Sequence, residues 1–174
     1  MVTKDSRLLE ENSMTHDFDS NSTENKQPSL SEEARQLVAA NRRGVLGTLL
    51  PNGGYPYASM VDYAPLPNGD VIMFLSQLAE HQKFITADSR ASLLIAPNIM
   101  ADNALAQPRV SLVGRVKRVE NRAEMAPIYL QVHPSAQQYI NFGDFQYYQL
   151  HVERARYIAG FGRMGWITDG RYHG

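Results

Sequence analysis

The residues best placed to bind a ligand lie between an apolar run at residues 71–75 and a predicted helix at residues 78–88. Ser76 and Gln77 follow the run, and His81 falls in the first turns of the helix. Hydroxyl and cationic donors at a strand end and a helix start, where backbone N–H groups also point outward, bind anions such as phosphate. A helix cap at Ser76 and an exposed helical His81 are the alternative interpretation of the same residues.

Other patterns of catalytic or metal-binding residues are missing from the sequence. The chain has no cysteine, which excludes disulfides, thiolate metal sites and thiol nucleophiles. No Gly-x-Ser-x-Gly, His-Glu-x-x-His or Walker motif occurs. The five histidines are scattered, at positions 16, 81, 133, 151 and 173, without the local spacing of metal ligands. We therefore predict neither a hydrolase nor a metal site.

The elements that must position these residues are mostly antiparallel strands. Apolar or alternating runs bounded by turn signals, such as Pro51-Asn52-Gly53-Gly54, predict strands at 44–50, 55–63, 71–75, 90–96, 110–119 and 145–159. Gly114 marks a bend in one of them. Helices are predicted at 29–38, behind a serine cap, and at 78–88 and 121–132. The fold class is mainly β with peripheral helices (α+β).

Composition divides the chain into an arm and one domain. Residues 1–30 carry few large apolar groups and are predicted to be a disordered arm, whereas residues 31–174 form the folded domain. Seventeen basic and 18 acidic side chains give a net charge of −1, so nucleic acid is not an expected partner. No long apolar run suggests a membrane span, and we expect a cytoplasmic protein.

This order of elements resembles the flavin-binding split β-barrel of the pyridoxamine-phosphate-oxidase-like superfamily, and most closely its HugZ-type branch, some members of which bind and degrade haem. The resemblance is carried by segments 43–48 (RGVLGT), 57–61 (YASMV), 74–81 (FLSQLAEH) and 159–166 (AGFGRMGW). It implies a six-stranded antiparallel split β-barrel of the FMN-binding type that works as a homodimer.

The resemblance also implies an FMN-dependent oxidoreductase acting on a small molecule that the sequence does not identify. The positions that match the family's cofactor-binding residues are Ser59, Met60, Val61, Ser76, Gln77, His81, Lys83, Arg109, Arg163 and Trp166. Oxidase members carry Arg and Lys on the segments where this chain has Ser59 and His81.

Two further hypotheses follow from the same family. A haem-binding or haem-degrading protein needs an axial donor, most often a neutral histidine oriented by an oxygen. The resemblance to HugZ-type members then draws attention to Asp144, beside Gly143, and to His173 near the C-terminus. The third hypothesis is a split-barrel dimer without any cofactor.

Overall fold

The computed structural model describes residues 27–97, 102–160, 162–168 and 170–173. Most of the predicted disordered arm, residues 1–26, lies outside the described residues.

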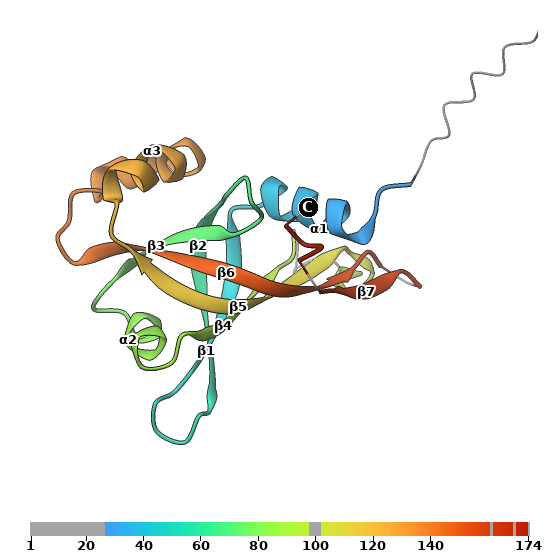
Figure 1. The fold of residues 1–174 in the computed structure, drawn as a ribbon, viewed down its shortest axis with the longest axis horizontal. Helices are drawn as coiled ribbons and strands as arrows, with labels where there is room; N and C mark the ends of the chain where they lie inside the picture. Colours follow the sequence, from blue (N-terminus) through green and yellow to red (C-terminus); the bar gives the residue numbers. More distant parts are fainter. Residues whose placement is uncertain (1–26, 98–101, 161, 169, 174) are drawn as a thin grey trace, which may run out of the picture.

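The described chain forms a closed antiparallel barrel with one additional strand (Figure 1). The strands are β1 (Arg43–Leu49), β2 (Pro56–Pro65), β3 (Val71–Ser76), β4 (Arg90–Ile95), β5 (Arg109–Val119), β6 (Phe145–Ile158) and β7 (Met164–Ile167). They pair in the order β3-β2-β1-β4-β5-β6-β7, and a further pairing of β3 with β6 closes the first six into a barrel. β7 pairs with the far end of β6.

Tight turns that need glycine connect the early strands. Gly53 and Gly54 have φ angles of 86° and 66° in the turn between β1 and β2, and Gly69 has a φ of 91° before β3. Glycine adopts these values without the steric cost that a Cβ brings. The turn signals in the sequence therefore predicted the β1-β2-β3 meander correctly.

The pairing of β5 with β6 shifts register between Val113 and Gly114, where Glu153 of β6 is the extra, unpaired residue. A Cβ on Gly114 would lie 1.9 Å from the carbonyl oxygen of His151, so only glycine fits there. Gly114 therefore marks a close approach of β5 to a bulge on β6, and the bend of its own strand stays a prediction.

Helices cover the rim of the barrel, and three α-helices occur within the described ranges: α1 (Leu30–Ala40), α2 (Glu80–Ala87) and α3 (Arg122–Val132). Short 3₁₀ turns lie at Ala104–Ala106 and Pro134–Gln138. The α1 helix begins with the expected capping box between Ser29 and Glu32, and Asn121 caps α3. The helix expected from residue 78 starts two residues later, because Ala79, not Ser76, is its N-cap residue.

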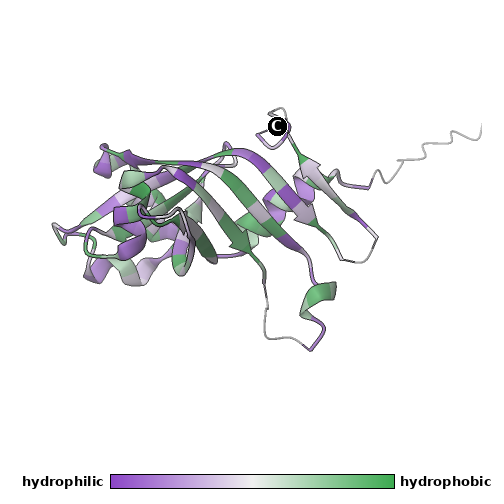
Figure 2. Cartoon of the chain, turned by 90° about the horizontal axis from the view of Figure 1, so that it is seen from below, coloured by the Kyte–Doolittle hydropathy of each residue, from purple (hydrophilic) through white to green (hydrophobic). Residues whose placement is uncertain are grey.

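Two hydrophobic clusters stabilise this arrangement. The larger fills the barrel and includes Leu46, Tyr63 and Leu150. The second includes Phe74 and Tyr129 and packs α3 against β3 and its neighbours. Residues of β3 face one cluster or the other, which explains its unbroken apolar sequence. Figure 2 shows apolar stretches along the barrel strands.

The predicted mainly β split barrel with peripheral helices is thus confirmed. The sequence did not separate β7 from β6. Gly160 and Gly162, at φ angles of 127° and 86°, turn the chain so that β7 folds back on β6. Within the described residues, no helix has the length and apolarity that a membrane crossing requires.

Candidate functional site

A groove of about 360 Å³ opens where β2 and β3 meet the start of α2 and the α3 region. It is lined by Met60, Val61, Asp62, Phe74, Leu75, Ser76, Ala79, His81, Tyr129, Tyr139 and Phe145. Most of these side chains are aliphatic or aromatic. No lysine or arginine occurs among the described lining residues.

His81 is the residue in this groove with the most distinctive surroundings. Its Nδ1 lies 3.0 Å from the Ser59 hydroxyl, which comes from the neighbouring strand β2. Its Nε2 is buried and has no hydrogen-bond partner among the described atoms. Burial lowers the pKa of His81 below its ordinary value of 6.5, so the ring is neutral at pH 7. A neutral ring with one nitrogen held by an oxygen and the other free has the chemistry of a metal-ligating histidine.

Ser76 has both of its hydrogen-bonding functions in use. Its hydroxyl donates to the Asp144 carboxylate at 2.7 Å and accepts from the Leu78 N–H at 3.1 Å. The Gln77 backbone N–H donates to the Asp144 carbonyl, and the Gln77 side chain is exposed. A carboxylate therefore lies at the junction where a phosphate was expected, and it would repel a second anion.

Lys83 lies outside the groove lining. It is exposed and forms an ion pair with Glu80, one turn earlier on α2, at 2.6 Å. The first turn of α2 thus carries a negative residue of its own, which further disfavours a phosphate there.

The remaining cofactor candidates lie elsewhere in the chain. Arg109, at the start of β5, donates to the Leu105 and Gln107 carbonyls. Arg163 is paired with Glu33 at 2.8 Å.

Trp166, on β7, is half-exposed and lies against two guanidinium groups, those of Arg154 and Arg156, at 5.5 and 5.9 Å from the ring centre.

A single chain brings together Ser59, Met60, Val61, Ser76 and His81. It does not bring Lys83, Arg109, Arg163 or Trp166 to the same groove.

Asp144 and His173 also lie apart within one chain. Asp144 immediately precedes β6, whereas the His173 ring contacts the Val152 carbonyl in the middle of that strand. The eight residue-to-residue steps from Asp144 to Val152 span about 26 Å at the rise of a β-strand. The two residues therefore do not form a haem-ligating pair within a single chain.

The sequence did not predict several lining residues. Asp62 shares a strand face with Met60 and could have been found from the alternation of β2. Tyr129 and Tyr139 come from α3 and the segment after it, and they reach the groove only because that region folds back over β3. No local sequence pattern signals such a contact.

The closed barrel with an apolar groove at one end defines the chain as a split β-barrel protein. Residues 25–174 match the CREG β-barrel family, and the chain belongs to this family.

Similar proteins support the predicted split-barrel relationship. The non-canonical heme oxygenase HOZ, chloroplastic, of Arabidopsis thaliana is 34% identical over 132 residues, covering 74% of this chain and 40% of the relative. A heme binding protein from Mycobacterium smegmatis is 36% identical with a TM-score of 0.78, covering 84% of this chain and 61% of that structure.

A third match concerns the fold alone. Campylobacter jejuni ChuZ shares 15% identity with a TM-score of 0.73, covering 84% of this chain and 63% of that structure. This chain therefore spans less than two thirds of the length of each of these proteins.

Proposed function

We propose that this chain binds haem in the groove, with His81 ligating the iron through Nε2. The observation that carries the proposal is the buried Nε2, which has no hydrogen-bond partner among the described atoms although it lines an apolar groove. Haem iron commonly takes a neutral histidine whose other ring nitrogen is held by an oxygen, and Ser59 provides that oxygen.

The walls of the groove suit a large apolar ligand. Phe74, Tyr129 and Phe145 form aromatic walls, of which Phe74 and Tyr129 are buried and the partly exposed Phe145 offers surface that a porphyrin can cover. When the Ser59 hydroxyl accepts the Nδ1–H of His81, the ring is in the tautomer that leaves Nε2 free to ligate iron. Haem bound here would supply the oxygen chemistry, and haem degradation by this chain is part of the proposal.

The similar proteins support haem over other ligands. The Arabidopsis relative is named as a heme oxygenase and the mycobacterial structure as a heme binding protein, at 34% and 36% identity. Both proteins are longer than this chain, which covers 40% of the first and 61% of the second.

FMN, with an oxidoreductase activity, is the competing proposal. Its phosphate would need donors at the Ser76 junction, but the Ser76 hydroxyl is already bonded to Asp144 and Lys83 is paired with Glu80. These contacts favour haem. FMN binding remains a prediction that the same experiment tests.

The test is a titration of the purified chain with haem, followed by its Soret absorption, and a parallel titration with FMN, followed by quenching of flavin fluorescence. We expect one haem per chain, with the spectrum of a histidine-ligated iron. His81→Gly should lose that spectrum and regain it when free imidazole is added, because imidazole can fill the space left by the side chain.

His151→Ala is the matched control, since His151 is exposed and lies outside the groove. It should bind haem like the wild type. A wild-type spectrum in His81→Gly without imidazole would contradict the assignment of His81, and binding of FMN but not haem would replace the proposal with the flavoprotein.

A cytoplasmic location, without nucleic-acid or membrane partners, also remains a proposal. The net charge of −1 supports the lack of a nucleic-acid partner. Cell fractionation with an antibody to this chain tests the location.

A further inference from the structure

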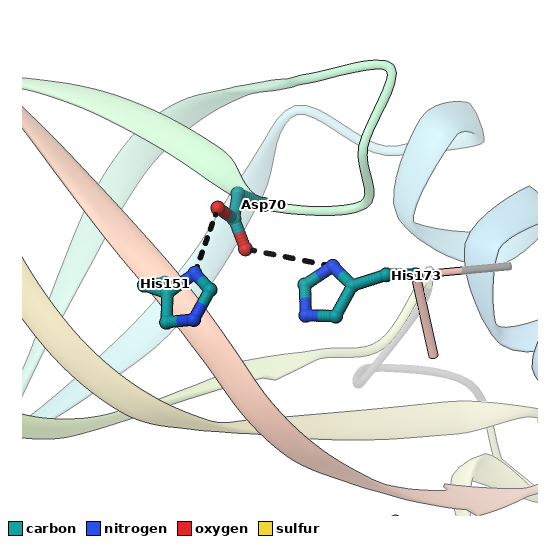
Figure 3. A group of neighbouring side chains, drawn as sticks. All are labelled: Asp70, His151 and His173. Atoms are coloured by element: carbon teal, nitrogen blue, oxygen red, sulfur yellow. Dashed lines mark hydrogen bonds and ion pairs between the residues drawn. The ribbon is translucent and has the colours of Figure 1, made fainter. Parts of the chain in front are cut away.

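A second group of chemically capable side chains lies away from the groove (Figure 3). Asp70 directly precedes β3, His151 lies in β6, and His173 comes from the turn that follows β7. Their possible ligand atoms all lie within 4.8 Å of one another. Asp70 is only 1% exposed, so this is not a set of solvated surface charges.

The distances suit a shared ion. His151 Nδ1 lies 3.1 Å from Asp70 Oδ2, and His173 Nδ1 lies 3.9 Å from Asp70 Oδ1. Ligand atoms bound to one Zn²⁺ at about 2.0–2.2 Å are themselves about 3–4 Å apart. Figure 3 shows the two imidazole rings on either side of the carboxylate, each with a nitrogen facing one of its oxygens.

The carboxylate is held in place by neighbouring groups, as metal-ligating carboxylates commonly are. Asp70 accepts hydrogen bonds from the Val152 N–H at 2.9 Å, the Gln149 amide at 2.7 Å and the Asn68 amide at 3.1 Å. These hydrogen bonds fix the orientation of the buried carboxylate beside the two imidazoles.

His173 carries the most specific signal. Its Nε2 lies 2.7 Å from the Val152 carbonyl and its Nδ1 lies 2.6 Å from the Asn68 carbonyl. Both ring nitrogens therefore face carbonyl oxygens, which only accept hydrogen bonds. An ion bound at Nδ1 would replace the contact of this nitrogen with the Asn68 carbonyl. The Nε2–H still donates to a backbone carbonyl, as is usual for metal-ligating histidines.

We propose that Asp70, His151 and His173 bind a divalent transition-metal ion of the Zn²⁺ class. Two imidazoles and one carboxylate are ligands that such ions accept. The His151 side chain is 59% exposed, which gives the ion a path from solvent. The bound ion ties the C-terminal turn to β3 and β6.

The experiment uses the full chain after treatment with a chelator and dialysis. Calorimetry with Zn²⁺ should show one ion per chain, and Co²⁺ should give the visible absorption of a protein-bound ion. His151→Ala and His173→Ala should each weaken Zn²⁺ binding more than about tenfold, and Gln149→Ala should do so by about 10–100-fold because it releases the carboxylate. Zn²⁺ should raise the melting temperature of the wild type more than that of these variants.

His81→Ala is the control and should bind Zn²⁺ like the wild type, whereas His151→Ala should still bind haem. The experiments therefore test the metal-binding proposal and the haem-binding proposal independently of each other. Because His151 is exposed, its replacement keeps the fold, which circular dichroism checks. No Zn²⁺ binding at about 0.1 mM, or binding unchanged in both His151→Ala and His173→Ala, would overturn the proposal and leave these side chains only their contacts with Asp70 and the backbone carbonyls.

Discussion

At the scale of single residues, two serine hydroxyls at one end of the barrel have different roles. Ser59 bonds to a neutral histidine whose second nitrogen is free, whereas Ser76 bonds to the Asp144 carboxylate and to a backbone N–H. The Ser59–His81 pair therefore leaves one ring nitrogen free to bind a ligand. The Ser76 hydroxyl already donates one hydrogen bond and accepts another, and we infer that it positions the start of α2 relative to β6.

Replacing Ser76 tests this division of roles. Ser76→Ala leaves the Asp144 carboxylate and the Leu78 N–H without a partner, so we expect the free energy of unfolding to fall by about 1–2 kcal/mol. Haem affinity should change less than about twofold. Urea unfolding and haem titration of the same preparation measure both quantities, and a tenfold loss of ligand affinity with unchanged stability would instead indicate a ligand bound at Ser76.

The lowered pKa of His81 has a consequence for stability against pH. Burial depresses the folded-state pKa below the ordinary 6.5, so between these two values the unfolded chain binds more protons than the folded chain. The stabilising contribution of a neutral His81 is therefore present above pH 6.5 and is lost as the pH falls through the folded pKa. We expect the unfolding free energy to drop less between pH 7.5 and 5.5 in His81→Gln than in the wild type, as measured by urea unfolding at each pH. An equal drop in both proteins would contradict this assignment.

At the scale of elements, the register shift between β5 and β6 depends on the absence of a Cβ atom at Gly114. Gly114→Ala would place a methyl group 1.9 Å from the His151 carbonyl oxygen, and backbone on β6 must move to accommodate it. We expect a loss of at least about 2 kcal/mol in the free energy of unfolding. Gly143→Ala is the matched control, because a Cβ there meets nothing within 4 Å, and its effect should stay within about 0.5 kcal/mol. Denaturant unfolding of both variants measures these free energies. Equal stability of Gly114→Ala and Gly143→Ala would contradict the close approach of Gly114 to the His151 carbonyl.

The elements themselves were largely predictable from the sequence, whereas their contacts were not. Local signals placed the cap at Ser29 and the turn at Gly53, because each depends on neighbours in the chain. Asp70 and His151 are 81 residues apart and meet only because β3 pairs with β6 to close the barrel. No periodicity or spacing in the sequence encodes the pairing of β3 with β6. The three proposed metal ligands are therefore scattered along the sequence.

At the scale of the whole molecule, the outer face of the barrel carries an apolar row that the described chain leaves uncovered. Val45 on β1 pairs with Met60 on β2 and with Leu94 on β4, so the three side chains line up across neighbouring strands. Met60 is 66% exposed and Leu94 38% exposed. The next row across the same strands is small, with Gly47 between Ala58 and Ser92, and lets another surface approach closely. Met60 also lines the groove, so a partner on this face would lie beside the proposed haem site.

We expect a second copy of the chain to cover this row, which gives the homodimer implied by the family. Light scattering at micromolar concentration should report twice the mass of one chain. Leu94→Glu should shift the protein toward monomer, because a carboxylate in a dry interface costs several kcal/mol unless it is paired. Lys117→Glu, an exposed charge change on β5 outside the row, should leave the dimer intact. A monomeric wild type, or a Leu94→Glu variant as dimeric as the control, would contradict this interface. A monomer that still binds haem would show that one chain suffices for the groove.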